Sequence, residues 1–198
     1  MGPERRREVN SQDRHNPVSD EERFRVIFQN RYPSIHSYVL RRLGSSSGEI
    51  SDVTAQVFDV AWRRRSHLPG PPDDLPWLYG VARKLVNRHW RSVRRRRQLG
   101  DRLTHEAKVS GEPSISPPSP DVTRVRTAMS RLRPADRELL RLIHWEQLSR
   151  AEAGQVIGCS ANAVSVRLHK ARQRLRTQLD KEADRHEAGP TEGPFHGT

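Results

Sequence analysis

Apolar residues recur at intervals of three and four along most of this chain, and this spacing constrains the fold more than any other feature. The first such run comprises Phe24, Ile27, Phe28, Tyr32, Ile35, Val39 and Leu43. Side chains spaced in this way share one face of an α-helix, whereas a half-buried strand needs strict alternation. No alternating stretch occurs in the sequence. We therefore expect an all-α protein.

Further helices are expected from about Ser51 to Trp62 and from about Trp77 through the run of arginines at 94–97. Beyond them, apolar patterns indicate helices from Val122 to Leu132, within "RPADRELLRLIHWE", within "SRAEAGQVIG" and from Ala161 to about Leu179. Ser19 and Glu22 are spaced as a capping box, which predicts the start of the first helix. Pro33 is expected to disturb that helix or to split it in two.

A stretch rich in proline and serine, "GEPSISPPSPD", divides the helical pattern into two parts. Such composition is typical of a linker. We expect a disordered arm over 1–19, a helical domain over 20–100, a flexible linker over 101–121, a second helical domain over 122–182 and a disordered tail over 183–198.

The chain has 198 residues, a formal net charge of +12 and a sequence pI near 11.1. A strongly basic protein most often binds nucleic acid, although a solvated basic surface or a codon bias toward arginine remains an alternative. Cys159 is the only cysteine, so neither an intrachain disulfide nor a four-cysteine metal site can form. The sequence shows no signal peptide and no apolar run of about 20 residues, so we expect a cytoplasmic protein without membrane insertion.

The segment from Ser160 to Leu179 contains basic side chains and no acidic one. On a helix its apolar residues form one stripe, namely Val164, Leu168, Ala171, Leu175 and Leu179. A short helix, a turn at Gly158 and a cap at Ser160 come before it. This order is that of a helix-turn-helix, whose second helix enters the major groove. A helical hairpin with a solvated arginine face is the alternative.

A second basic stretch without acids runs from Leu75 to Gly100 and includes Trp77, Tyr79 and Trp90. Basic residues interleaved with aromatic ones suit single-stranded DNA, whose bases can stack on the rings. The alternative, that Trp77 belongs to the core, carries more weight. We find no H-E-x-x-H, no phosphate-binding glycine loop and no histidines at ligand spacing. We therefore expect neither an enzyme nor a cofactor.

Three segments together resemble the extracytoplasmic-function group of sigma factors, the promoter-recognition subunits of bacterial RNA polymerase. "SDVTAQVFDVAWRR" is similar to the family pattern A-E-D-x-x-Q-x-V-F-x-x-A-W, and "WLYGVARKLVNRHWR" to W-L-x-x-I-A-R-N-x-x-x-D-x-x-R. The segment from "LRPADRELL" to "RLHKARQRLRTQL" is similar to the family's C-terminal helix-turn-helix. The resemblance covers about residues 20–100 and 122–180, which are sigma regions 2 and 4.

The resemblance implies that the chain binds core RNA polymerase at the β′ coiled coil and the β flap, that it binds promoter DNA, and that an anti-sigma factor controls it. Asp52 and Gln56 fall where the family contacts the β′ coiled coil. The residues that fall at −10 positions are Asp73 and Asp74, in the loop that holds a flipped base, and Arg83, Lys84, Arg88 and Arg91. The residues that fall at −35 positions are Asn162, Ser165, Val166, Arg167, His169, Lys170 and Arg172.

The sequence departs from the family pattern at several of these positions. Lys84 replaces an asparagine and Arg88 replaces an aspartate, so recognition of the −10 element is expected to differ. Ser51 replaces a glutamate next to Asp52. A free-standing helix-turn-helix regulator is the alternative function. Its upstream domain would normally be α/β, and the helical pattern of residues 20–100 argues against it.

Overall fold

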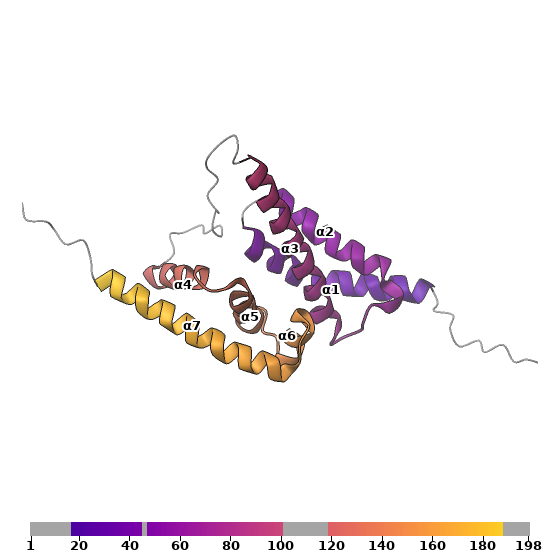
Figure 1. Cartoon of the computed structure of the whole chain (residues 1–198). Coiled ribbons are helices and arrows are strands. Elements are labelled where there is room, and N and C mark those ends of the chain that lie inside the picture. The colour runs from indigo at the N-terminus through magenta and orange to yellow at the C-terminus, as the bar shows by residue number, and fades with distance from the viewer. Residues whose placement is uncertain (1–16, 45–46, 101–118, 188–198) are drawn as a thin grey trace, which may run out of the picture.

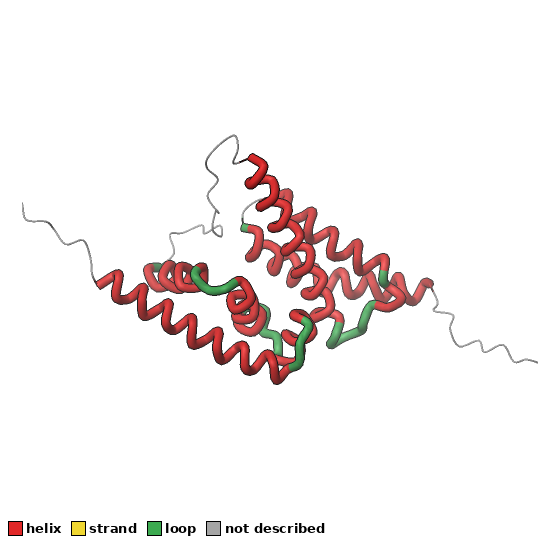
Figure 2. The backbone as a smooth tube through the Cα atoms, in the orientation of Figure 1, coloured by secondary structure: helices red, strands yellow, loops and turns green. Residues whose placement is uncertain are grey.

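A computed structural model of the chain describes residues 17–44, 47–100 and 119–187. These residues form α-helices and one 3-10 helix, without a strand among them, which confirms the all-α expectation (Figure 2). The elements are α1 (Pro17–Leu43), α2 (Ser47–Arg63), η1 (Arg65–His67), α3 (Asp74–Gly100), α4 (Pro120–Ser130), α5 (Pro134–His144), α6 (Arg150–Ile157) and α7 (Ala161–Glu187). The expected arm before residue 17, the segment 101–118 and the tail after 187 lie outside the described residues.

Helices α1, α2 and α3 pack on one another and form the first half of the molecule (Figure 1). The spacing of the apolar residues explains this packing, because each helix directs one stripe toward a shared core. The core residues are Ile27, Ile35, Tyr38 and Val39 from α1, Val53, Val57 and Ala61 from α2, and Leu78, Ala82 and Val86 from α3.

Two expectations for α1 need correction. Of the two outcomes expected at Pro33, the split does not occur, because the helix continues through this residue. Ile27 and Ile35, on either side of the proline, are both buried in the same core, and this shared burial holds the two segments in one helix. The helix also begins at Pro17, so Ser19 lies within its first turn and is not the capping residue.

Helices α4, α5 and α6 all pack against the long helix α7 and form the second half. Arg137 of α5 closes the end of α4, because its guanidinium donates to the carbonyls of Met129 (2.9 Å), Ser130 (2.6 Å) and Leu132 (3.0 Å). Burial lowers the pKa of Arg137.

Helix α7 continues beyond residue 182, where we expected the second domain to end. In this last part, Glu182 is paired with Arg131, directly after α4, and with Arg185 of α7 itself. The pair with Arg131 holds the end of α7 against the end of α4, and no apolar stripe in the sequence predicts it.

The two halves pack directly against each other, with α6 lying on α3 (Figure 1). Arg42 of α1 lies at the centre of this contact, with a side chain only 4% exposed. It donates to Glu138 of α5 (Nε to Oε2, 3.0 Å) and to Glu146 after α5 (Nη1 to Oε1, 2.9 Å). Arg41 also pairs with Glu146, and the hydroxyl of Tyr38 donates to Glu138 at 2.7 Å. We call these residues the Arg42 cluster, together with Tyr79, whose hydroxyl lies 3.4 Å from Glu146.

Burial and the neighbouring charges shift the pKa values of three side chains in this cluster. Burial raises the pKa of Tyr79 to about 12, and the negative charge of Glu146 adds to the effect. Burial and the charge of Glu138 raise the pKa of Tyr38 well above its usual value. Burial alone would lower the pKa of Arg42, but Tyr38, Glu138 and Glu146 together raise it. The cluster therefore holds neutral tyrosines and charged arginines at neutral pH.

The described part of the chain contains neither a candidate membrane-spanning helix nor a candidate metal site. None of its helices combines the length and the apolar character needed to cross a membrane. Its histidine, cysteine, aspartate and glutamate side chains do not gather in groups of three or more that could hold a metal ion.

Gly154 of α6 lies against the backbone of the turn that leads into α7. A Cβ atom at this position would lie 2.5 Å from the carbonyl oxygen of Cys159, which is backbone and cannot move aside cheaply. We expect Gly154→Ala to lower the free energy of unfolding by about 1–3 kcal/mol, even though alanine favours a helix. Thermal unfolding followed by circular dichroism measures this loss.

Gly48 of α2 is the matched control, because a Cβ there meets nothing within 4 Å. Gly48→Ala is expected to leave stability unchanged or to raise it by up to about 1 kcal/mol. Equal stability of the Gly154→Ala and Gly48→Ala proteins would show that the close approach of Gly154 to the backbone of Cys159 does not limit stability.

Candidate nucleic-acid interface

Local capping fixes the angle between α6 and α7. Ser149 and Glu152 form a capping box at the start of α6, with hydrogen bonds of 3.2 and 2.7 Å between side chains and backbone. Gly158 ends α6 in the left-handed conformation (φ 76°), which glycine adopts without steric cost. Ser160 then begins α7, its hydroxyl accepting the Ala163 N–H at 3.2 Å. The helix, turn and helix expected from the sequence are all present.

Helix α7 buries the expected apolar stripe and leaves the opposite face free. Val164, Leu168 and Ala171 are buried, with Leu175 partly buried behind them. Ser165 is partly buried and its hydroxyl donates to the carbonyl of Ala161 at 3.1 Å. The other residues that we expect to contact the −35 element are all exposed, namely Asn162, Val166, Arg167, His169, Lys170 and Arg172. The structure therefore brings the whole candidate −35 set to one accessible end of α7.

Two arginines of α7 have partners inside the second half. Arg174 pairs with Asp136 of α5, its Nη1 lying 2.7 Å from the carboxylate oxygen. Arg172 approaches the ring of His144 at 3.4 Å. Arg176 is exposed farther along the helix. Arg174 thus serves the packing of α5 on α7, while Arg176 remains available to a phosphate.

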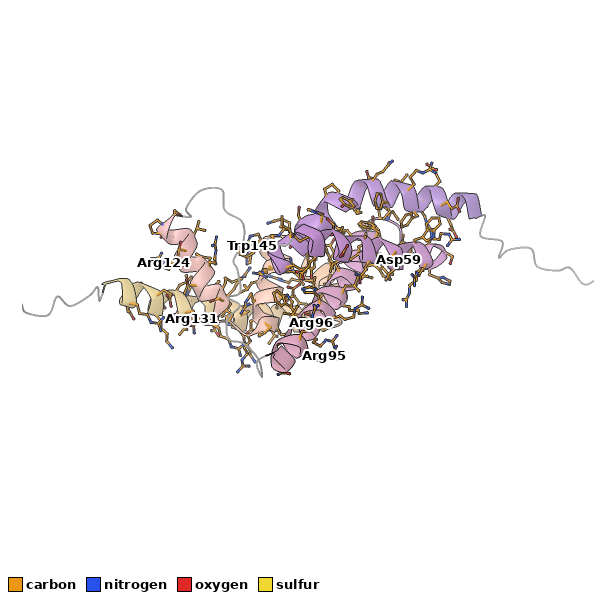
Figure 3. The ribbon with its side chains drawn as sticks, turned by 90° about the horizontal axis from the view of Figure 1, so that it is seen from above. Asp59, Arg95, Arg96, Arg124, Arg131 and Trp145 are labelled. Carbon is orange, nitrogen blue, oxygen red and sulfur yellow. The ribbon has the colours of Figure 1, made fainter. Side chains whose placement is uncertain are left out.

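Helix α3 carries the second basic surface. Lys84, Arg88 and Arg91 are exposed and lie three or four residues apart, so they share one face, with Arg83 partly buried beside it. Figure 3 shows Arg95 and Arg96 near the far end of the same helix, where both side chains are exposed. The basic face therefore extends over several turns of α3.

The aromatic residues of this stretch take part in packing. Tyr79 is buried in the Arg42 cluster, and Trp77 and Trp90 are partly buried against the core. The indole N–H of Trp90 donates to the backbone carbonyl of Arg42 at 3.3 Å. The sequence favoured a place in the core for Trp77. Packing in the core describes all three rings better than a surface on which DNA bases stack.

The candidate polymerase-binding residues of α2 adjoin this basic face. Asp52 and Gln56 are exposed one helical turn apart. The guanidinium of Arg88 donates to the side-chain oxygen of Gln56 at 2.6 Å. Arg88, which departs from the family pattern, thus links the candidate −10 surface with the candidate polymerase surface.

Asp73 and Asp74, where the preceding loop joins α3, lie in different environments. Asp74 is buried and accepts two hydrogen bonds from Arg31 of α1, at 2.7 and 3.1 Å. Asp73 is exposed, and its carboxylate accepts a hydrogen bond from Gln155 of α6 at 3.0 Å. Asp74 therefore anchors the loop to α1. Asp73 is the aspartate that a ligand in the solvent can reach.

Comparison with known proteins gives matches that extend over both halves. The family model described as "Sigma-70, region 4" matches residues 123–175. The probable RNA polymerase sigma factor RfaY of Xanthomonas campestris pv. campestris is 30% identical over 175 residues, covering 86% of this chain and 43% of RfaY. The ECF RNA polymerase sigma factor BldN of Streptomyces coelicolor is 27% identical over 164 residues, covering 81% of this chain and 61% of BldN.

The fold also matches a solved structure of the same class. The sigma factor RpoE of Bartonella quintana, determined in complex with the anti-sigma factor NepR, superposes with a TM-score of 0.58 at 21% identity. The superposition covers 79% of this chain and 96% of RpoE. Along most of its length the chain is similar to sigma factors of the extracytoplasmic-function group. It spans less than two thirds of the length of RfaY and of BldN.

Sequence reasoning missed the contact between the loop at Asp73 and α6 of the helix-turn-helix. Gln155 and Asp73 are 82 residues apart, and Gln155 lies in no motif that points to this contact. The contact follows from the packing of α6 on α3, which only the folded chain reveals.

The different environments of Asp73 and Asp74 give a direct test of their roles. Asp74→Asn is expected to lower the free energy of unfolding by about 1–3 kcal/mol, because Arg31 loses a buried charged acceptor. Asp73→Asn, at the neighbouring exposed position, is expected to change it by no more than about 0.5 kcal/mol. Urea unfolding of both proteins measures the difference, and equal losses would mean that Asp74 is not the anchor.

Proposed function

We propose that this chain is a sigma factor that binds core RNA polymerase and directs it to promoters with specific −10 and −35 elements. The observation that carries the proposal is the exposed face of α7, which presents polar and basic side chains and contains no acidic residue before Asp180. A helix in this position after a short helix and a tight turn is the recognition helix of a helix-turn-helix.

The second half, residues 122–182, is proposed to read the −35 element. Its side chains Asn162, Ser165 and Val166 lie near the start of α7, where a recognition helix contacts base edges. His169 and Lys170 follow one turn later, and either can form hydrogen bonds with bases. Arg167 and Arg172 flank this row and are suited to phosphates. This half is also the proposed partner of the β flap.

The first half, residues 20–100, is proposed to bind the β′ coiled coil through Asp52 and Gln56 and the −10 element through α3. The exposed face of Lys84, Arg88 and Arg91, with Arg83 beside it, supplies positive charge for a DNA strand. Asp73 and, beneath it, Asp74 belong to the proposed −10 loop. The sigma factor would act in the cytoplasm with RNA polymerase and promoter DNA, under the control of an anti-sigma factor.

Transcription from a promoter library with purified core polymerase tests the proposal. We expect transcripts only when the chain is added, and a defined −35 preference among the active promoters. His169→Ala is expected to change that preference, because a good base contact contributes about 1–3 kcal/mol of discrimination. Arg176→Ala is expected to weaken all promoters about equally, since a phosphate contact carries no sequence information.

Asp52→Lys is the control for polymerase binding and is expected to reduce transcription from every promoter by preventing assembly. An unaltered −35 preference for both His169→Ala and Lys170→Ala would contradict the assignment of this face. Tight, sequence-specific binding to duplex DNA by the isolated chain at physiological salt would favour a free-standing regulator instead.

A further inference from the structure

A side-chain contact between α2 and α3 joins two surfaces that the proposed function assigns to different ligands. The guanidinium of Arg88 in α3 donates to the side-chain oxygen of Gln56 in α2 at 2.6 Å. We propose that Arg88 is a positioning residue for polymerase binding, which orients the Gln56 amide so that its NH2 group faces the polymerase. This inference rests on the proposed function, because Gln56 belongs to the proposed β′-binding pair.

The core fixes the rotation of both helices and therefore the approach of Arg88 to Gln56. In α2, Val53 and Val57 are buried, and Val57 follows directly after the exposed Gln56. In α3, Val86 is buried two positions before the exposed Arg88. The two helices pack on each other, and neither can turn about its axis without exposing these valines to water. The contact is thus a consequence of the fold.

The chemistry of the two groups determines which end of the amide faces outward. A guanidinium carries N–H donors and no acceptor, whereas a glutamine side chain carries an oxygen acceptor and an NH2 donor group. Arg88 therefore holds the oxygen of Gln56 and cannot accept from its NH2 group. Charge-assisted hydrogen bonds are roughly twice as strong as neutral ones, so this bond favours one orientation of the amide. The NH2 group is left to donate to an acceptor on a partner.

The family pattern has an aspartate at position 88, which would favour the opposite orientation. A carboxylate accepts hydrogen bonds without donating any. An aspartate that bonded the same amide would hold its NH2 group and turn its oxygen outward. The replacement by Arg88 therefore reverses the polarity that the surface presents at Gln56.

Asp52 lies on the same face of α2 as Gln56 and completes this surface. It is exposed, and it forms no ion pair with any residue that the structure describes, so its carboxylate is available to a cation. One turn earlier, the carboxylate of Glu49 lies 3.7 Å from Nε2 of His89 in α3. Helix α3 thus contacts α2 on both sides of Asp52. The surface fits a partner that presents a basic side chain opposite Asp52 and a hydrogen-bond acceptor opposite Gln56.

Arg88 can serve this surface and a DNA strand together. A guanidinium has several N–H donors in a planar fork. The donors that do not hold Gln56 can bind a phosphate of the proposed −10 strand. The affinity for core polymerase in the absence of DNA therefore isolates the effect that Arg88 has through Gln56.

Titration of the fluorescently labelled, full-length chain with core polymerase, without DNA, tests the positioning role in a double-mutant cycle. We expect Arg88→Ala and Gln56→Ala each to weaken binding by about tenfold, a loss of about 1.4 kcal/mol. Because Arg88 acts through Gln56, the double variant is expected to bind as well as Gln56→Ala alone. Arg88→Lys is expected to keep most of the affinity, since an ammonium also donates without accepting. Losses that add up in the double variant would overturn the positioning role.

Arg95→Ala is the matched control for the lost charge. Arg95 is exposed and lies two helical turns farther along α3, where its position is labelled in Figure 3. Its removal takes away the same charge from the same helix and leaves the bond between Arg88 and Gln56 in place. We expect its affinity for core polymerase to stay within about twofold of the parent. A loss as large as that of Arg88→Ala would show that charge alone matters and would overturn the proposal.

Gln56→Glu separates the orientation of the amide from simple packing. The carboxylate has the same shape and still accepts from Arg88, but it has no NH2 group to donate. We expect core binding to fall as far as in Gln56→Ala, while the thermal unfolding temperature of the free chain does not fall. Arg88→Asp is expected to weaken core binding at least as strongly, because it turns the amide around. Binding of Gln56→Glu equal to or tighter than that of the parent would overturn the proposed orientation.

Nuclear magnetic resonance of the free chain measures the contact without polymerase. We expect Arg88→Ala to shift the signals of the Gln56 side-chain NH2 group and Arg95→Ala to leave them in place. Unchanged signals in Arg88→Ala would overturn the contact.

Asp52→Lys distinguishes a failure of this inference from a failure of the proposed function. If Asp52→Lys and Gln56→Ala both leave core binding unchanged, the proposed polymerase surface is refuted and the inference is overturned with it. If both weaken core binding while Arg88→Ala does not, the polymerase surface stands and only the positioning role of Arg88 is overturned.

Discussion

Arg42 is a guanidinium almost completely removed from water, and the arrangement of the whole chain depends on how its charge is satisfied. Its partners, Glu138 and Glu146, come from the opposite half of the molecule. Removing one partner of a buried pair typically costs about 3–5 kcal/mol, so the two halves are held together while the pairs are intact. If the halves separate, water can take the place of the carboxylates.

The positions of the candidate site residues follow from this arrangement. Helix α7 keeps its exposed face clear of the first half, whereas α6 lies against α3 and binds Asp73. In this arrangement the proposed −35 surface is thus accessible and the proposed −10 loop is partly covered. Arg88, bonded to Gln56, joins the remaining basic surface to the proposed polymerase surface. Polymerase binding and −10 binding, the two activities that we propose for the first half, therefore share one continuous set of side chains.

The features that the sequence predicted well are local ones. The stripe of Val164, Leu168 and Ala171 determined which face of α7 is buried, and the glycine turn and the Ser160 cap were readable because they depend on neighbouring residues. Pro33 was misjudged because burial on both sides of it outweighs the lost hydrogen bond. The Arg42 cluster was not predicted at all. Arg42 and Glu138 are 96 residues apart, and their spacing follows no helical period that a sequence pattern can reveal.

A structure of the chain bound to core polymerase on promoter DNA, determined by electron cryomicroscopy, tests the central claim most directly. The claim is that the exposed face of α7 reads the −35 element and that the basic face of α3 contacts the −10 element. The account predicts that α7 lies in the major groove at −35, with His169 and Lys170 at base edges, and that Lys84, Arg88 and Arg91 of α3 face the −10 strand. A bound chain in which α7 lies outside the major groove, or in which this face of α3 points away from the DNA, would contradict it.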